Sequence, residues 1–153
     1  MDNLAQLMVA MVLMVLSLTL AYASTPLNAI EVVFNDQTPV SNTHLIQSSL
    51  QAQGVTVGFY NLDAPAQLSK DLSQGLPAHI ELAKKIVLQR LNQDGSAALN
   101  ARYQSAYQAL SKSLAYGLDR FPAVVFNHGQ AVVYGVTDLA VAVQMFQQWQ
   151  VKQ

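Results

Sequence analysis

The sequence predicts a single α/β domain built on a mixed four-stranded sheet. Three observations lead to this prediction. Four short runs rich in β-branched and aromatic residues are separated by helical patterns or by one tight turn. Charged residues make up only 11% of the chain and apolar residues 52%, which is a globular composition and excludes intrinsic disorder. At 153 residues, the chain has room for one hydrophobic core.

The first half of the domain is predicted to be a strand, a helix and a second strand. Residues 29–34 (AIEVVF) form the first strand. Ser41 or Asn42 can cap a helix that Gly54 ends, and residues 55–62 (VTVGFYNL) follow as the second strand. A helix that crosses between two strands makes them parallel, with a right-handed connection.

Three inserted helices are predicted next. Asp63 caps the first, which Gly75 ends, and an apolar stripe from Ile80 to Leu91 marks the second. The third and longest covers about residues 97–116, and its stripe has spacings of 4, 3, 4 and 4, which predicts packing against the core. The stripe consists of Leu99, Tyr103, Ala106, Leu110 and Leu114.

The second half of the domain is predicted to be two strands and a helix. Residues 121–126 (FPAVVF) form the third strand, residues 127–130 a hairpin turn, and residues 131–134 an antiparallel fourth strand. Thr137 or Asp138 caps the last helix. The complete order is therefore β-α-β-(α-α-α)-β-β-α, a βαβ half and a ββα half with helices inserted between them.

The titratable residues give no sign of catalysis or metal binding. There is no cysteine, which excludes thiol chemistry, and His44, His79 and His128 lack metal-ligand spacing. Eight Lys and Arg against nine Asp and Glu leave no basic surplus for nucleic acid. Glu31 is expected to point outward, because an unpaired buried carboxylate is costly. We predict no catalytic residue, no cofactor and no metal.

An apolar leader precedes the domain. The run from Leu7 to Leu20 ends in Ala21-Tyr22-Ala23, which predicts a signal peptide over residues 1–23 and an exported, periplasmic domain over residues 24–153. The leader has no Lys or Arg before its apolar run, and the alternative is an uncleaved membrane anchor. This leader is the only membrane contact that we expect.

The order of the elements resembles the thioredoxin fold. The Phe121-Pro122 pair opens the third strand, where thioredoxin-like proteins carry a cis-proline, and residues 37–40 (QTPV) occupy the place of the redox Cys-x-x-Cys. The resemblance implies a thioredoxin-like fold without thiol chemistry and a cis bond at Pro122. It also implies a groove for an extended peptide, with Thr38 and Pro39 on one lip and Phe121 and Pro122 on the other.

Two segments carry a closer resemblance. Residues 62–77 (LDAPAQLSKDLSQGLP) and 121–138 (FPAVVFNHGQAVVYGVTD) are similar to a family of small exported proteins of integrating conjugative elements, encoded with the type IV secretion, or mating-pair formation, apparatus. The chain departs from that family at His79-Ile80. In outline it is also similar to the TrbC-type pilus-assembly proteins. The resemblance implies a non-catalytic periplasmic role in conjugation, with protein subunits of the apparatus as partners.

Other functions and surfaces stay open at this point. An exported chaperone-like peptide binder and a cysteine-free enzyme are the alternative functions. Tyr103, Phe146 and Trp149 fall on apolar stripes and are predicted to lie in the core. Tyr107 and Tyr116 lie nearer the edge of the stripe on the long helix and form an alternative partner surface.

Overall fold

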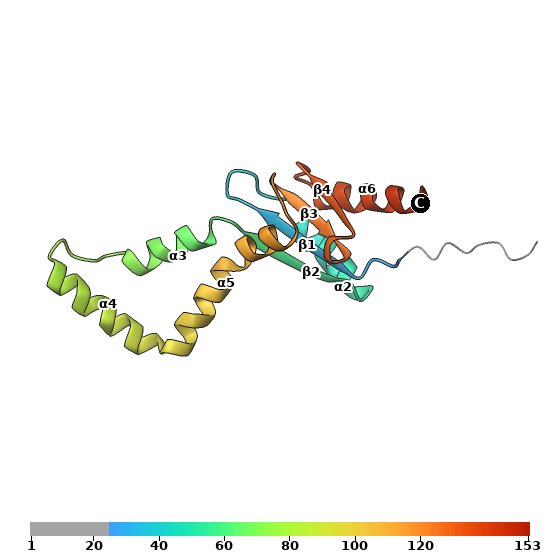
Figure 1. Cartoon of the computed structure of the whole chain (residues 1–153). Helices are drawn as coiled ribbons and strands as arrows, with labels where there is room; N and C mark the ends of the chain where they lie inside the picture. Colours follow the sequence, from blue (N-terminus) through green and yellow to red (C-terminus); the bar gives the residue numbers. More distant parts are fainter. Residues whose placement is uncertain (1–24) are drawn as a thin grey trace, which may run out of the picture.

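The computed structural model describes residues 25–153, and the predicted signal peptide over residues 1–23 lies outside this range. The predicted order of strands and helices is confirmed (Figure 1). The elements are β1 (Ala29–Phe34), α2 (Thr43–Ala52), β2 (Thr56–Asn61), α3 (Ala64–Ser73), α4 (Ile80–Asp94), α5 (Ser96–Ala115), β3 (Ala123–Phe126), a 3-10 turn η1 (Asn127–Gly129), β4 (Ala131–Tyr134) and α6 (Leu139–Val151).

The four strands form one mixed sheet in the order β2-β1-β3-β4. β1 is parallel to β2 and antiparallel to β3, and β3 is antiparallel to β4. Val32 in β1 therefore lies between Phe59 of β2 and Val124 of β3. This arrangement confirms the predicted thioredoxin-like α/β fold. β1 and β3 are the central strands and are almost entirely buried, because helices cover both faces of the sheet.

The main hydrophobic core lies between the sheet and the helices α2 and α6. Phe126 of β3 and Phe146 of α6 stack in this core with their ring centroids 4.3 Å apart. Trp149 packs on Phe146 but is 36% exposed, so it lies at the rim of the core rather than inside it. Asp138 caps α6 as predicted, because its Oδ1 accepts a hydrogen bond of 2.8 Å from the Ala140 N–H.

The opposite face of the sheet is covered by α5, and of the five residues predicted to form the buried face of this helix only Ala106 is buried. The side chains that α5 buries are small: Ala106, Ala109 and Ser113. Leu110 and Leu114 are 54% and 84% exposed. Small side chains let the helix approach the sheet closely, and the larger apolar side chains then face away from it. Tyr103 is also exposed and lies outside the core in which it was predicted.

The helices α3, α4 and α5 extend away from the sheet as an arm (Figure 1). Only the C-terminal part of α5 returns to the sheet, near β1 and β2. α4 chiefly contacts α5, and none of its described side chains is buried. No helix within residues 25–153 is long and apolar enough to cross a membrane.

The turn regions around β3 differ in detail from the expectation. β3 begins at Ala123, so Phe121 and Pro122 precede the strand instead of opening it. The Phe121–Pro122 peptide bond is cis, which confirms the prediction. The link between β3 and β4 is a 3-10 turn in which Asn127 and His128, as well as Gly129, have positive φ.

Candidate functional site

The loop after β1 carries one lip of the predicted groove. Thr38 is held in a closed turn by Asn35: the Thr38 N–H and hydroxyl donate to Asn35 Oδ1 at 2.8 and 2.7 Å. Asp36 fixes the same loop to the end of β2 and to α3, because its carboxylate accepts hydrogen bonds from Asn61 and Gln67. The lip is therefore an ordered turn with Pro39 exposed beside it.

The other lip precedes β3. Pro122 is buried, and its C=O accepts a hydrogen bond of 2.8 Å from the Gly135 N–H. The Phe121 N–H and C=O have no hydrogen-bond partner within residues 25–153. The segment between β4 and α6 contacts both lips. Its Gly135 bonds to Pro122, and the C=O of its Thr137 accepts a hydrogen bond of 2.7 Å from the N–H of Ser41, which follows Pro39 in the other lip. The four predicted residues thus lie on two segments that both bond to residues 135–137. No hydrogen bond joins the two lips directly among the described residues.

A charged network lies under the sheet, where the sequence predicted an outward-facing carboxylate. Glu31 of β1 points inward, against α5, and its side chain is 8% exposed. Lys112 Nζ donates to Glu31 Oε1 at 2.5 Å, and the Tyr116 hydroxyl donates to Oε2. The expected outward direction was wrong because a partner at the end of α5 removes the cost of burial. Tyr116 therefore anchors the arm and does not belong to a free partner surface.

The charge states of this network favour a structural role. Burial alone would raise the pKa of Glu31, but the hydrogen bonds from Lys112 and Tyr116 outweigh it and hold this pKa below its usual value. The hydrogen bond to Glu31 raises the pKa of Lys112. Burial and the same carboxylate raise the pKa of Tyr116. Each shift strengthens the charge state that the group already has at neutral pH, whereas acid–base catalysis needs pKa values moved toward 7.

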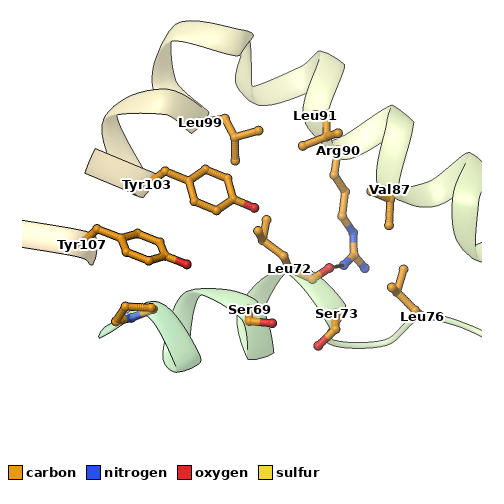
Figure 2. Close-up of a pocket in the computed structure, with 11 residues that line it drawn as sticks. Ser69, Leu72, Ser73, Leu76, Val87, Arg90, Leu91, Leu99, Tyr103 and Tyr107 are labelled. Carbon is orange, nitrogen blue, oxygen red and sulfur yellow. Dashed lines mark hydrogen bonds between the residues drawn. The ribbon is translucent and has the colours of Figure 1, made fainter. Parts of the chain in front are cut away.

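A second candidate site, which we call the cradle, lies between the three helices of the arm. It is a cavity of about 470 Å³ into which apolar side chains of α3, α4 and α5 and of the loop after α3 converge (Figure 2). Its apolar wall consists of Leu72, Leu76, Val87, Leu91 and Leu99, with Tyr103 and Tyr107 beside it. The rings of the two tyrosines border the cavity and their hydroxyl groups point into it (Figure 2).

Arg90 is the charged residue of the cradle wall. Its Nη1 donates to the carbonyl oxygens of Leu72 and Gln74, at 3.2 and 2.9 Å. These carbonyls lie at the C-terminal end of α3, where helix carbonyls lack partners within the helix. No described carboxylate of residues 25–153 pairs with Arg90. The guanidinium is thus held in place at an apolar cavity without a counter-charge.

Sequence reasoning did not find the cradle as a site. Val87, Leu91, Leu99 and Tyr103 were assigned to apolar stripes, whereas Tyr107 was predicted to belong to an alternative partner surface. A further signal was Arg90, a charged residue directly beside Leu91 on the stripe of α4. Within the described residues, no three His, Cys, Asp or Glu side chains are grouped so that they could hold a metal ion.

The comparisons with known proteins place the chain in a family. A family model with the description "Protein of unknown function (DUF1525)" matches residues 29–152. The chain belongs to the DUF1525 family. Comparison with curated proteins and with solved structures found no match. The DUF1525 match runs from β1 to the end of α6, so it includes the arm and the cradle as well as the sheet.

The DUF1525 chain therefore has two candidate surfaces for binding. The first is the region of the predicted groove, where the backbone N–H and C=O of Phe121 have no partner among residues 25–153 and could pair with an extended chain. The second is the cradle, which offers apolar side chains and one fixed cation. Apolar clefts with a few directed polar groups are typical of binding sites.

Proposed function

We propose that this DUF1525 protein is a non-catalytic binding module in the assembly of a conjugative type IV secretion apparatus, encoded by an integrating conjugative element and located in the periplasm. The observation that carries the proposal is the arm, whose apolar side chains are left uncovered. The similarity of residues 62–77 and 121–138 to proteins of such elements supports the conjugative setting. The partners would be protein subunits of the apparatus.

The arm exposes more apolar surface than a free domain usually does. Six large apolar side chains on α4 and α5 are at least 47% exposed, and Tyr103 is 43% exposed. Three of the six, Tyr107, Leu110 and Leu114, follow one another at three and four residues on one side of α5, and grouped apolar exposure marks sites of protein interaction. The six are Ile80, Leu82, Leu88, Tyr107, Leu110 and Leu114.

The non-catalytic part of the proposal is supported by chemistry. A thiol oxidoreductase needs cysteine, and residues 37–40 (QTPV) stand where the redox pair would lie. Glu31, Lys112 and Tyr116 are hydrogen-bonded to one another, and the pKa of each is shifted away from neutrality; the His128 Nδ1 lies 3.9 Å from the same carboxylate, beyond hydrogen-bond distance.

Deletion of the gene tests the proposed role. A clean deletion in a donor strain that carries the element is expected to reduce the frequency of transfer, because an assembly module is lost. Mating frequency is the measurement, and the unchanged gene supplied in trans is expected to restore it. Normal transfer from the deletion strain would contradict the assembly role.

The predicted groove can be tested in the same strain. Thr38→Arg places a long cation on the lip after β1 and is expected to lower transfer without unfolding the domain, since a loop side chain adds little to the core. Thr56→Arg is the matched control, because Thr56 is exposed at the start of β2. β1 and β2 are parallel, so this position lies at the opposite end of the sheet. Full complementation by Thr38→Arg would exclude the groove.

A further inference from the structure

We infer that the cradle, together with the exposed face of α5, binds an amphipathic helix of a partner protein that carries Asp or Glu along the borders of its apolar face. The inference rests on the proposed function and adds the chemistry of the partner to it. Three observations select this occupant: the spacing of the exposed side chains, the concave shape of the site and the distribution of charge.

The exposed apolar residues of α5 have the spacing of a helix–helix seam. Tyr103, Tyr107, Leu110 and Leu114 follow one another at intervals of four, three and four residues, and all four are exposed. Alternating intervals of three and four are the pattern by which one helix receives the side chains of another. We call these four residues the ridge. α5 has 20 residues, so that the ridge runs along much of a helix about 30 Å long. A small molecule in the cavity would contact Tyr103 and Tyr107 but would leave Leu110 and Leu114 uncovered.

The shape of the cradle distinguishes a helix from a membrane. Leu72, Val87 and Leu99 come from three different helices and converge on one cavity (Figure 2). A single side chain of a bound helix can enter such a hollow, as knobs enter holes between helices. A bilayer surface is broad and would contact the outer sides of the helices, leaving the hollow empty.

The charge distribution selects an acidic partner. The three helices of the arm carry six Lys or Arg and three Asp or Glu, and one of the six cations, Lys112, is paired with Glu31 of β1. The remaining residues of the range 25–153 carry two Lys or Arg and five Asp or Glu. Two copies of the arm placed ridge to ridge would bring like charges together, which disfavours a second copy of this chain in that position. Acidic residues beside the apolar face of a partner helix would complement the arm.

Two cations lie where the partner helix would pass. Arg90 is fixed at the cavity wall by the carbonyls of Leu72 and Gln74. Lys84 is exposed and lies three residues before Val87 and seven before Leu91, so it shares their side of α4. Lys85 is the next residue and points about 100° further around the helix, away from the cradle.

A binding assay with synthetic helices tests this inference. The probe is a fluorescent peptide of about three heptads with Leu at the seam and Glu beside it, and its twin carries Lys in place of Glu. Fluorescence anisotropy with the full chain is expected to show binding of the Glu peptide and at least about tenfold weaker binding of the Lys twin. Equal affinity for the two peptides would overturn the inference.

Matched variants locate the binding. Lys84→Glu is expected to weaken the Glu peptide about tenfold, and Lys85→Glu, the same charge change on the neighbouring residue, to leave it nearly unchanged. Leu110→Ser on the ridge is expected to weaken it as well. Leu45→Ser is its control, because Leu45 is equally apolar and 78% exposed but lies on α2. Equal effects within either pair would show that the peptide binds elsewhere.

Two further measurements cover the other occupants. Light scattering that shows a dimer abolished by Leu110→Ser would assign the ridge to a second copy. Binding to phosphatidylglycerol vesicles that Leu110→Ser abolishes would assign it to a membrane. Either result overturns the inference. If deletion of the gene lowers transfer but Lys84→Glu and Leu110→Ser both complement fully, the inference fails while the proposed function stands.

Discussion

Phe146→Ala is expected to lower the free energy of unfolding by about 3–5 kcal/mol. Phe146 is 1% exposed and lies between Phe126, at 4.3 Å between ring centroids, and Trp149, at 5.6 Å. Truncation to alanine removes both ring contacts and leaves a cavity between α6 and the sheet that close-packed neighbours fill only in part. Urea denaturation followed by circular dichroism measures the change.

A neighbouring residue on α6 provides the control for Phe146. Met145 is 45% exposed, and Met145→Ala removes a side chain of similar length from the surface of the same helix. It is expected to change the free energy of unfolding by less than about 1 kcal/mol. A cost of Phe146→Ala no larger than that of Met145→Ala would contradict the assignment of the core between the sheet and α6.

Glu31→Gln is expected to lower the free energy of unfolding by about 2 kcal/mol at neutral pH. The change leaves the Lys112 ammonium beside a neutral amide under the sheet. The cost is placed below that of breaking a fully buried pair, because Lys112 remains 32% exposed. Asp119→Asn is the control, since Asp119 pairs with Arg120 at the surface with both side chains more than 70% exposed. Its loss is expected to cost almost nothing.

The same network contributes a pH dependence to the stability of the fold. The pKa of Glu31 is lower in the folded chain than its ordinary value of 4.5, so its stabilisation is complete above pH 4.5 and is lost as the pH falls through the folded pKa. The pKa of Lys112 is raised above 10.5, so its contribution is complete below that pH and is lost at higher pH. Glu31→Gln should therefore flatten the loss of stability in acid. An acid limb as steep as that of the unchanged chain would contradict this account.

The strands and their order could be predicted because local patterns determine them. The run over residues 29–34 has the bounds of β1, and the crossover helix makes β1 and β2 parallel. The four strands carry β-branched residues between clear turn signals, and central strands buried on both faces show little alternation. The start of the third strand was placed two residues too early, because the cis-proline segment that precedes Ala123 continues the same apolar run.

The orientation of α5 could not be predicted in the same way. Its apolar stripe is real, but a stripe shows only that a face avoids water and does not identify what covers it. The buried side shares Ala106 with the predicted stripe and otherwise consists of Ala109 and Ser113. This orientation brings Lys112 and Tyr116 to Glu31. That choice depends on a carboxylate more than 80 residues away along the chain, and helical periodicity carries no information about such a pairing.

Asn127 links the start of the described chain to the turn η1. Its amide donates to the C=O of Pro26 at 3.1 Å and accepts from the Asn28 N–H at 2.9 Å. Gln150 near the end of α6 donates to the C=O of Thr25 at 2.7 Å. Residue 25 and the C-terminus are thereby fastened at the same end of the molecule, and the arm projects from the other (Figure 1). A fluorescent protein, an affinity handle or a surface tether joined at either of these points would leave the arm pointing into the solution and within reach of large assemblies.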